Sequence, residues 1–238
     1  MASAETRREG LKALWRQAQD CTRCAELAAT RQSVVFGAGN ADADLMFIGE
    51  APGANEDKQG LPFVGQAGRL LDTLLEGIGL ARGDVFIANV LNCRPPGNRD
   101  PLPAEIDACQ EYTFRQLELI EPRVVCTLGN FATKLLRADP ATGITKLHGR
   151  EEVCRIGPRT VRLYPIYHPA AALYTPSMRA VLEEDFARIP ELLALPAPEQ
   201  PAREEVEPVV PEPEVLAPEP PAPDRPVCAA PDPQLGLF

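Results

Sequence analysis

Four short apolar runs constrain the fold of this chain most, because each has the length of a single β-strand. The runs span residues 44–49, 84–90, 122–129 and 160–169, and they alternate with segments of helical periodicity. The expected helices are residues 5–19, 67–80, 103–119, 130–137 and 177–195, the last of them bent or broken at Pro190. Strands that alternate with helices predict a parallel sheet covered by helices on both faces.

Charge and proline divide the chain into two parts. The 238 residues have a net charge of −10, but residues 196–238 hold 9 of the 34 acidic residues, only 2 of the 24 basic ones, and 13 of the 26 prolines. These last 43 residues therefore carry −7, and residues 1–195 carry −3. A segment this polar and proline-rich buries too little apolar surface to offset the conformational entropy that it would lose on ordering. We expect a folded domain over residues 1–195 and a disordered acidic linker over residues 196–233.

The composition also narrows the setting and the partners. No apolar run is long enough to span a membrane, and the N-terminal sequence lacks the apolar core of a secretory signal. A chain that is acidic overall is not a simple basic nucleic-acid binder. We expect a cytoplasmic, monomeric protein with no membrane partner.

Seven cysteines are spaced like metal ligands rather than like a disulfide framework. Cys21 and Cys24 form a C-x2-C pair, and Cys93 and Cys109 flank a proline-rich loop. Four thiolates would make a closed tetrahedral set for zinc or for an iron–sulfur cluster, and the spacing alone favours zinc. The alternative is that Cys109 only packs in the core and that the C-x2-C pair stands alone. The other three are expected to be two packing residues and a free thiol in the tail: Cys126, Cys154 and Cys228.

A glycine-rich loop and three polar side chains gather at the expected carboxyl ends of the strands. The loop over residues 49–68 contains five glycines, so its backbone turns sharply or approaches a ligand closely. Glu50, Asn89 and His168 follow or end strands at the edge where open α/β sheets bind ligands. Phe63, in the loop, is either a core residue or a stacking platform for a planar ring. Taken singly, Asn89 and His168 fit ordinary hydrogen-bonding residues, but three such positions at one edge indicate a binding crevice.

Three stretches of the sequence closely resemble the family 4 uracil-DNA glycosylases, which carry a [4Fe–4S] cluster. They are GEAPG…ED…G.PFVG.AG in the glycine-rich loop, NVLNCRPPGNRDP after the second strand, and HPAAAL after the fourth, and the resemblance covers about residues 10–193. It implies a three-layer α/β/α fold, Rossmann-like, with a central four-stranded parallel sheet. It also reverses the metal ranking, so that Cys21, Cys24, Cys93 and Cys109 would bind a [4Fe–4S] cluster.

The resemblance assigns three residues to the recognition of uracil. Phe63 would stack on a uracil flipped out of the DNA. The Asn89 carboxamide would accept from uracil N3–H and donate to O4, an arrangement that cytosine does not match. His168 would lie beside uracil O2, where a fixed donor stabilises the negative charge that grows as the C1′–N1 bond breaks.

The same resemblance leaves open which residue activates the attacking water. Glu50 would face the sugar and the scissile bond, and would orient the water or stabilise the positively charged sugar. Ala51, like Glu50 expected to border the bound uracil, stands where family 1 enzymes have aspartate, so no dedicated base is evident. Glu56 would lie near uracil C5 and exclude the thymine methyl group. The implied activity is hydrolysis of the N-glycosidic bond of uracil in single- or double-stranded DNA, which releases uracil and leaves an abasic site.

Two alternatives stay open at this point. A non-catalytic iron–sulfur or zinc protein could bind uracil-containing DNA as a sensor or scaffold, although the intact set of site residues argues against it. An enzyme of broader range could also act on hypoxanthine or mismatched bases. DNA contacts are expected from basic residues in or beside the motif loops, and such contacts weaken with salt. These residues are Lys58, Arg69, Arg94, Arg99 and Arg179.

The last five residues differ from the rest of the tail. Gln234, Leu235, Leu237 and Phe238 resemble the Q-L-x-L-F peptide with which bacterial replication and repair proteins bind the β sliding clamp. An apolar anchor at the end of a disordered chain suits a tethered peptide ligand. The alternative is an apolar terminus without a partner. We expect residues 234–238 to bind the clamp and the protein to act at the nucleoid.

Overall fold

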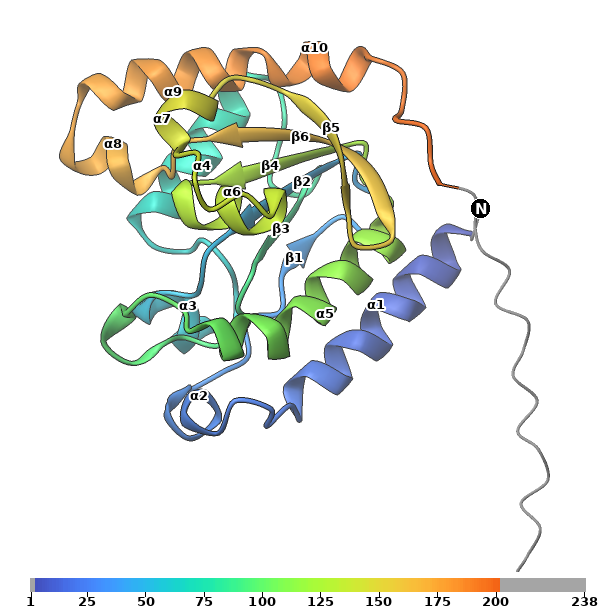
Figure 1. The fold of residues 1–238 in the computed structure, drawn as a ribbon, viewed down its shortest axis with the longest axis vertical. Coiled ribbons are helices and arrows are strands. Elements are labelled where there is room, and N and C mark those ends of the chain that lie inside the picture. The colour runs from blue at the N-terminus through green and yellow to red at the C-terminus, as the bar shows by residue number, and fades with distance from the viewer. Residues whose placement is uncertain (1–2, 202–238) are drawn as a thin grey trace, which may run out of the picture. The chain divides into compact units, whose positions relative to one another are not determined.

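A six-stranded, mostly parallel sheet forms the middle of the folded body (Figure 1). The structure, a computed structural model, describes residues 3–201. The strand order is β1-β3-β2-β4-β6-β5, and the inner four strands run parallel. These are β2 (Leu45–Gly49), β3 (Phe86–Asn89), β4 (Val124–Leu128) and β6 (Arg159–Ile166). The central four-stranded parallel sheet and the four strands expected from the sequence are thereby confirmed.

Each edge of the sheet carries a further strand beyond the four expected to run parallel, and of the two only a strand at Cys154 was expected from the sequence. β1 (Ala38–Gly39) pairs antiparallel with β3, and β5 (Glu152–Ile156) pairs antiparallel with β6. β1 has only two residues, and β5 alternates between partly buried and exposed positions. Neither has the continuous apolar run that marks a strand buried on both faces.

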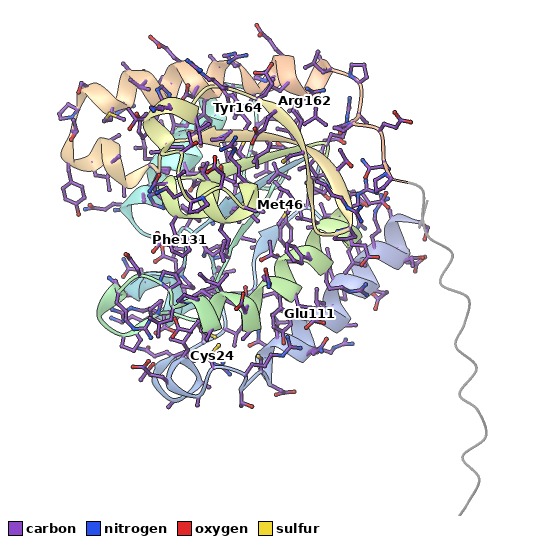
Figure 2. All side chains as sticks on the ribbon, in the orientation of Figure 1. Cys24, Met46, Glu111, Phe131, Arg162 and Tyr164 are labelled. Carbon is purple, nitrogen blue, oxygen red and sulfur yellow. The ribbon has the colours of Figure 1, made fainter. Side chains whose placement is uncertain are left out.

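The inner strands are buried on both faces. Every residue of β2 and β4 is buried, which is why their sequences read as unbroken apolar runs. Neighbouring side chains on a strand point to opposite faces, so Met46 and Phe47 belong to two different core clusters. Figure 2 shows Met46 on the side of α5 (Pro103–Ile120) and Tyr164 on the side of α9 (Ser177–Ala187).

Helices cover both faces of the sheet and complete the expected three layers (Figure 1). One face is covered by α1 (Ala4–Gln19), α5 and α6 (Asn130–Arg137). The other is covered by α4 (Gln66–Gly77), α9 and α10 (Ile189–Ala194). The expected break at Pro190 is confirmed, because α9 ends at Ala187 and the proline stands in the first turn of α10. Short helical segments in the loops are α2 (Ala25–Thr30), α3 (Ala54–Gln59), η1 (Pro96–Asn98), α7 (Ile144–Leu147) and α8 (Ala170–Tyr174).

The described chain stays bound to the body past the last helix. The Gln200 side chain donates to the Thr160 carbonyl (2.8 Å) and accepts from the Thr160 amide (3.2 Å), at the beginning of β6. The expected linker over residues 196–233 is described only as far as Pro201, where Gln200 is bound to the body; the rest of it, the Cys228 thiol and the expected clamp peptide at residues 234–238 lie outside the described residues. Over residues 3–201, no helix has the length and apolar character needed to cross a bilayer.

Candidate active site

A cleft of about 590 Å³ opens at the carboxyl edge of the parallel strands. Its walls come from the glycine-rich loop after β2, from the proline-rich loop after β3, and from α8 after β6. Five of the six residues expected to bind uracil line it, namely Glu50, Ala51, Glu56, Phe63 and His168. They converge because parallel strands present their carboxyl ends at one edge of a sheet.

Asn89, the sixth expected residue, lies behind the wall of the cleft. It is the last residue of β3, pairs in register with Gly49 of β2, and is only 2% exposed. A Cβ at Gly49 would lie 2.5 Å from Asn89 Oδ1 and 2.8 Å from Phe63 Cζ. The missing side chain at Gly49 therefore leaves room for the Asn89 amide and the Phe63 ring to lie beside each other.

His168 is held in one tautomer. The Ala170 amide donates to His168 Nδ1 (3.1 Å), so this nitrogen is unprotonated and the ring proton sits on Nε2. The ring keeps some exposure toward the cleft. Burial among protein atoms nevertheless lowers the pKa of His168 to about 4, although the negative charge of Glu56 acts to raise it. At neutral pH, His168 is an uncharged imidazole with one N–H donor.

Phe63 lies under the cleft in an unusual backbone conformation. Its φ angle is +52°, in the left-handed region that non-glycine residues rarely adopt. The ring stacks against the imidazole of His168, with ring centroids 5.5 Å apart and an interplanar angle of 29°. The turn thus places an aromatic face next to the imidazole donor.

Glu56 supports the same turn. Its Oε1 accepts from the amides of Val64 and Gly65, each at 2.9 Å, directly after Phe63. Its other oxygen, Oε2, would lie 2.7 Å from a Cβ at Gly53. Glu56 therefore lines the cleft and fixes the loop, while the expected contact with uracil C5 stays a prediction.

Glu50 carries the carboxylate nearest the end of β2. Burial, together with repulsion from Asp100, raises the pKa of Glu50 above its usual value. Glu50 and Glu56 are the carboxylates among the described residues that line the cleft. Ala51 lines the cleft beside Glu50 and brings no acidic group.

The basic residues expected near DNA differ in their surroundings. Arg99 donates to both oxygens of the largely buried Glu105 (2.6 and 2.9 Å) and to Glu26 (2.8 Å), so its charge is balanced within the protein. Arg94 donates to Asn98 Oδ1 (2.8 Å), and Arg179 pairs with Glu183 one helical turn away. Lys58 and Arg69 are exposed. Arg99 is therefore the least suited of the five to a DNA phosphate, and it joins α2 to the beginning of α5.

The four cysteines expected to bind metal line one cavity. Cys21 and Cys24 lie between α1 and α2, Cys93 follows β3, and Cys109 lies in α5. Figure 2 shows Cys24 beside α2, at the end of the molecule where α1 and α5 meet this helix. Two N–H groups point at sulfur: Arg31 Nη1 donates to Cys93 Sγ (3.2 Å), and the Asn92 amide to Cys109 Sγ (3.4 Å).

Burial favours the protonated form of three of these thiols. Burial raises the pKa of Cys24 and of Cys93, and raises that of Cys109 to about 12. A metal centre would replace the protons of such thiols when it binds. Among residues 3–201, no three His, Cys, Asp or Glu side chains are grouped so that they could hold one metal ion. The four cysteines are the donors that this cavity offers to a metal centre.

The remaining described cysteines are packing residues, as expected. Cys126 is fully buried in β4. Cys154, in β5, packs against the core cluster that contains Met46, and burial raises its pKa to about 11.

Several site residues were not predicted from the sequence. Leu173 and Tyr174 of α8 line the rim of the cleft and are 40% and 86% exposed. The signal available for them was the HPAAAL stretch, of which Leu173 is the last residue and which Tyr174 follows directly. Arg31 carried no such signal, because its contact with Cys93 joins segments 62 positions apart.

Comparison with known proteins supports what the fold and the cleft indicate. The model of the uracil DNA glycosylase superfamily matches residues 36–191. A type-4 uracil-DNA glycosylase of Sulfurisphaera tokodaii is 44% identical over 192 residues, which cover 79% of this chain and 87% of the relative. Relatives of the same description from Archaeoglobus fulgidus (47% identical, covering 77% and 94%) and Saccharolobus solfataricus (47% identical, covering 75% and 84%) also match.

The three-layer fold, the cleft at its carboxyl edge and the family match place this chain in the uracil DNA glycosylase superfamily. Within that superfamily, the chain belongs to the type-4 uracil-DNA glycosylases, the description shared by its three relatives.

Proposed function

We propose that the cleft binds a uracil nucleotide that has been rotated out of DNA and hydrolyses the bond between base and sugar. As a type-4 uracil-DNA glycosylase, the chain releases free uracil and leaves an abasic site, the first step of base excision repair. A base inside a duplex is out of reach of an enzyme, so it leaves the stack before the reaction. The observation that carries the proposal is the meeting of the Phe63 ring and the uncharged His168 imidazole in one cleft.

Uracil is recognised by stacking and by one amide. The Phe63 ring offers a flat apolar surface, and stacking of a base on an aromatic ring contributes about 1–3 kcal/mol. Asn89 accepts from uracil N3–H and donates to O4. Cytosine presents an acceptor at N3 and an amine at C4, so the same amide orientation leaves buried groups unpaired, and cytosine is rejected.

Cleavage depends on where charge develops. Water adds to C1′ while the C1′–N1 bond breaks, the electron pair of that bond passes to uracil, and the proton lost by water leaves to solvent or to Glu50. Negative charge then grows on uracil O2, where the Nε2–H of His168 donates to it. A donor that is already oriented stabilises this charge more than it stabilises the substrate.

Glu50 stabilises the positive charge that develops on the sugar as the base leaves. The sugar gains oxocarbenium character as the base leaves, and a carboxylate beside it stabilises that charge. The ionised form is the useful one, although burial and Asp100 make its proton harder to lose. Ala51 supplies no second carboxylate, so Glu50 carries the electrostatic work on this side of the cleft.

Cys21, Cys24, Cys93 and Cys109 are proposed to hold a [4Fe–4S] cluster. Support comes from the shared cavity, from the N–H groups directed at two of the sulfurs, and from the family to which the chain belongs. When bound, the cluster would supply a covalent connection between the N-terminal segment and the 93–109 loop that borders the cleft.

The tail is proposed to bind the β sliding clamp through residues 234–238. Support for this partner is the sequence of Gln234, Leu235, Leu237 and Phe238 alone. The enzyme would then work as a monomer at the nucleoid, on single- and double-stranded DNA, in the cytoplasm.

A base-release assay tests the proposed site. The purified protein is incubated with labelled oligonucleotides that contain uracil, hypoxanthine or a mismatched thymine, and abasic sites are revealed by alkaline cleavage. We expect cleavage at uracil, and a loss of roughly 10²-fold or more in Asn89→Ala and His168→Ala.

The matched control is Arg115→Ala, which removes an exposed arginine paired with Glu118 on α5, away from the cleft. Full activity in both site variants would overturn the assignment of the site. Binding of uracil-containing DNA without base release would instead favour a sensor or scaffold, and cleavage at hypoxanthine would broaden the substrate range.

A further inference from the structure

The turn that carries Phe63 is held from outside the cleft by Arg82. This arginine lies in the connection between α4 and β3, 19 residues after Phe63, and it does not line the cleft. Its Nη1 donates to the Phe63 carbonyl (3.0 Å), and its Nη2 donates to the Pro62 carbonyl. One planar guanidinium thus binds two successive peptide groups of the turn.

The guanidinium is itself oriented by a carboxylate. Arg82 Nη1 also donates to Asp72 Oδ1 (3.0 Å), and Asp72 lies in α4, the helix that follows the turn. The two side chains are about a third exposed, at 30% and 39%, so the pair lies at the surface. Because the guanidinium is planar, the hydrogen bond to Asp72 also fixes the plane in which Arg82 donates to the two backbone carbonyls.

The Phe63 backbone requires such support. With a φ of +52°, Phe63 holds a conformation that an aromatic residue adopts only when its surroundings impose it. Gly68 approaches so closely that a Cβ there would overlap the Phe63 carbonyl, which leaves that oxygen free to accept from Arg82. On the other side of the turn, Glu56 binds the amides of Val64 and Gly65. The peptide groups from Pro62 to Gly65 are therefore held at both ends.

We propose that Arg82 is a positioning residue for uracil, which acts by setting the plane of the Phe63 ring. Asp72 orients the Arg82 fork, the fork fixes the carbonyls of Pro62 and Phe63, and the fixed backbone presents the ring to the base. Arg82 touches neither the base nor the sugar. The inference rests on the proposed stacking role of Phe63.

A double-mutant cycle tests this chain of contacts. The single-turnover rate of uracil release is measured at saturating enzyme for wild type, Arg82→Ala, Phe63→Ala and the double variant. A ring displaced by a fraction of an ångström to about 1 Å lowers the rate by roughly ten- to a hundredfold, so we expect a loss of that size in Arg82→Ala. The double variant should be no slower than Phe63→Ala alone, because Arg82 has nothing left to position.

Graded variants separate positioning from general stability. Arg82→Lys keeps the charge but cannot donate to both carbonyls in one plane, so an intermediate rate is expected. Asp72→Asn keeps Arg82 and removes its orienting charge, and should lose less than Arg82→Ala. Arg115→Ala should match wild type. The enzyme concentration at half-saturation with DNA should stay unchanged in all of them, since none of these side chains lines the cleft.

Thermal unfolding followed by circular dichroism accompanies every variant. If Arg82→Ala is unfolded at the assay temperature, Asp72→Asn and Arg82→Lys take its place in the same cycle with Phe63→Ala. A double variant whose loss equals the product of the two single losses would overturn the inference, as would wild-type rates in Arg82→Ala.

The cycle also distinguishes this inference from the function on which it rests. Full activity in Phe63→Ala would overturn the stacking role itself, and the positioning role with it. Loss of activity in Phe63→Ala, with wild-type rates in the Arg82 and Asp72 variants, would leave stacking intact and overturn only the role of Arg82.

Discussion

Residues at the base of the cleft combine close packing with controlled protonation. His168 is kept uncharged by burial and by a backbone N–H at Nδ1, so in the proposed reaction it would donate a hydrogen bond without carrying a charge of its own. Glu50 experiences the same low polarity in the opposite sense, because burial raises the pKa of an acid while it lowers that of a base. Burial therefore favours the uncharged form of both side chains.

The pH dependence of uracil release should report Glu50. Because its pKa is raised, Glu50 gains a proton at a pH above the usual value of 4.5, and the rate should fall as the pH is lowered through this range. His168 stays neutral down to about pH 4 and should not contribute to this decline. Single-turnover rates between pH 4.5 and 8 give the measurement.

Two variants assign the acidic decline. Burial is the main cause of the raised Glu50 pKa, and Asp100→Asn removes the repulsion that adds to it, so the decline should move to somewhat lower pH. Glu50→Gln should be slow, by roughly 10²-fold or more, and independent of pH over the same range. A decline that persists unchanged in Glu50→Gln would assign it to another group.

Gly49 should tolerate no side chain. An alanine Cβ would lie 2.5 Å from Asn89 Oδ1 and 2.8 Å from the Phe63 ring, so both recognition groups would have to move. We expect Gly49→Ala to lower the rate of uracil release by roughly 10²-fold while the protein still folds. Gly77→Ala, at a position where a Cβ meets no atom within 4 Å, is the control. Equal rates in Gly49→Ala and wild type would contradict the placement of Asn89.

At the scale of elements, the sequence predicted what burial determines. β2 and β4 read as unbroken apolar runs because both faces are covered, and the strand ends followed from the residues after those runs. β1 could not be predicted, since a two-residue strand leaves no apolar run, and the half-exposed β5 was expected only as a strand around Cys154, without a place in the sheet. Contacts such as Arg82 with Phe63 depend on how separate loops meet, and no local pattern encodes them.

The loops that carry the cysteines should be joined by iron. The purified protein should be brown, absorb in the visible blue, and contain iron and acid-labile sulfide. Cys24→Ser should lose this absorbance and unfold at a lower temperature, because one ligand of the cluster is removed.

Cys154→Ser, in an edge strand away from the cavity, should keep the absorbance of the wild-type protein. Metal analysis by mass spectrometry accompanies both cysteine variants. A colourless protein with stoichiometric zinc would overturn the cluster and restore the interpretation that cysteine spacing alone favours.

At the scale of the whole molecule, most of the negative charge lies in the C-terminal segment and little of it in the folded body. Residues 1–195 carry −3 and residues 196–238 carry −7, so the acidic segment is not the part that contains the cleft. We expect a body with so small a net charge to bind DNA weakly, and attachment to a clamp would raise its effective concentration at DNA.

Deletion of residues 234–238 should abolish binding to the β sliding clamp, measured by co-elution on gel filtration. The rate on short oligonucleotides should stay that of the full chain, because no clamp takes part in that assay. Val209→Ala, which changes an apolar residue elsewhere in the acidic segment, is the control. Clamp binding that survives the deletion would overturn the proposed peptide.

The hydrogen bonds between Gln200 and Thr160 hold the last described residues of the chain on the body. Thr160 is the second residue of β6 and His168 follows the end of the same strand, so Gln200 contacts the end of β6 opposite the cleft. Residues 196–201 take no part in the lining of the cleft, so the connection to the proposed clamp peptide does not begin at the surface that would bind uracil.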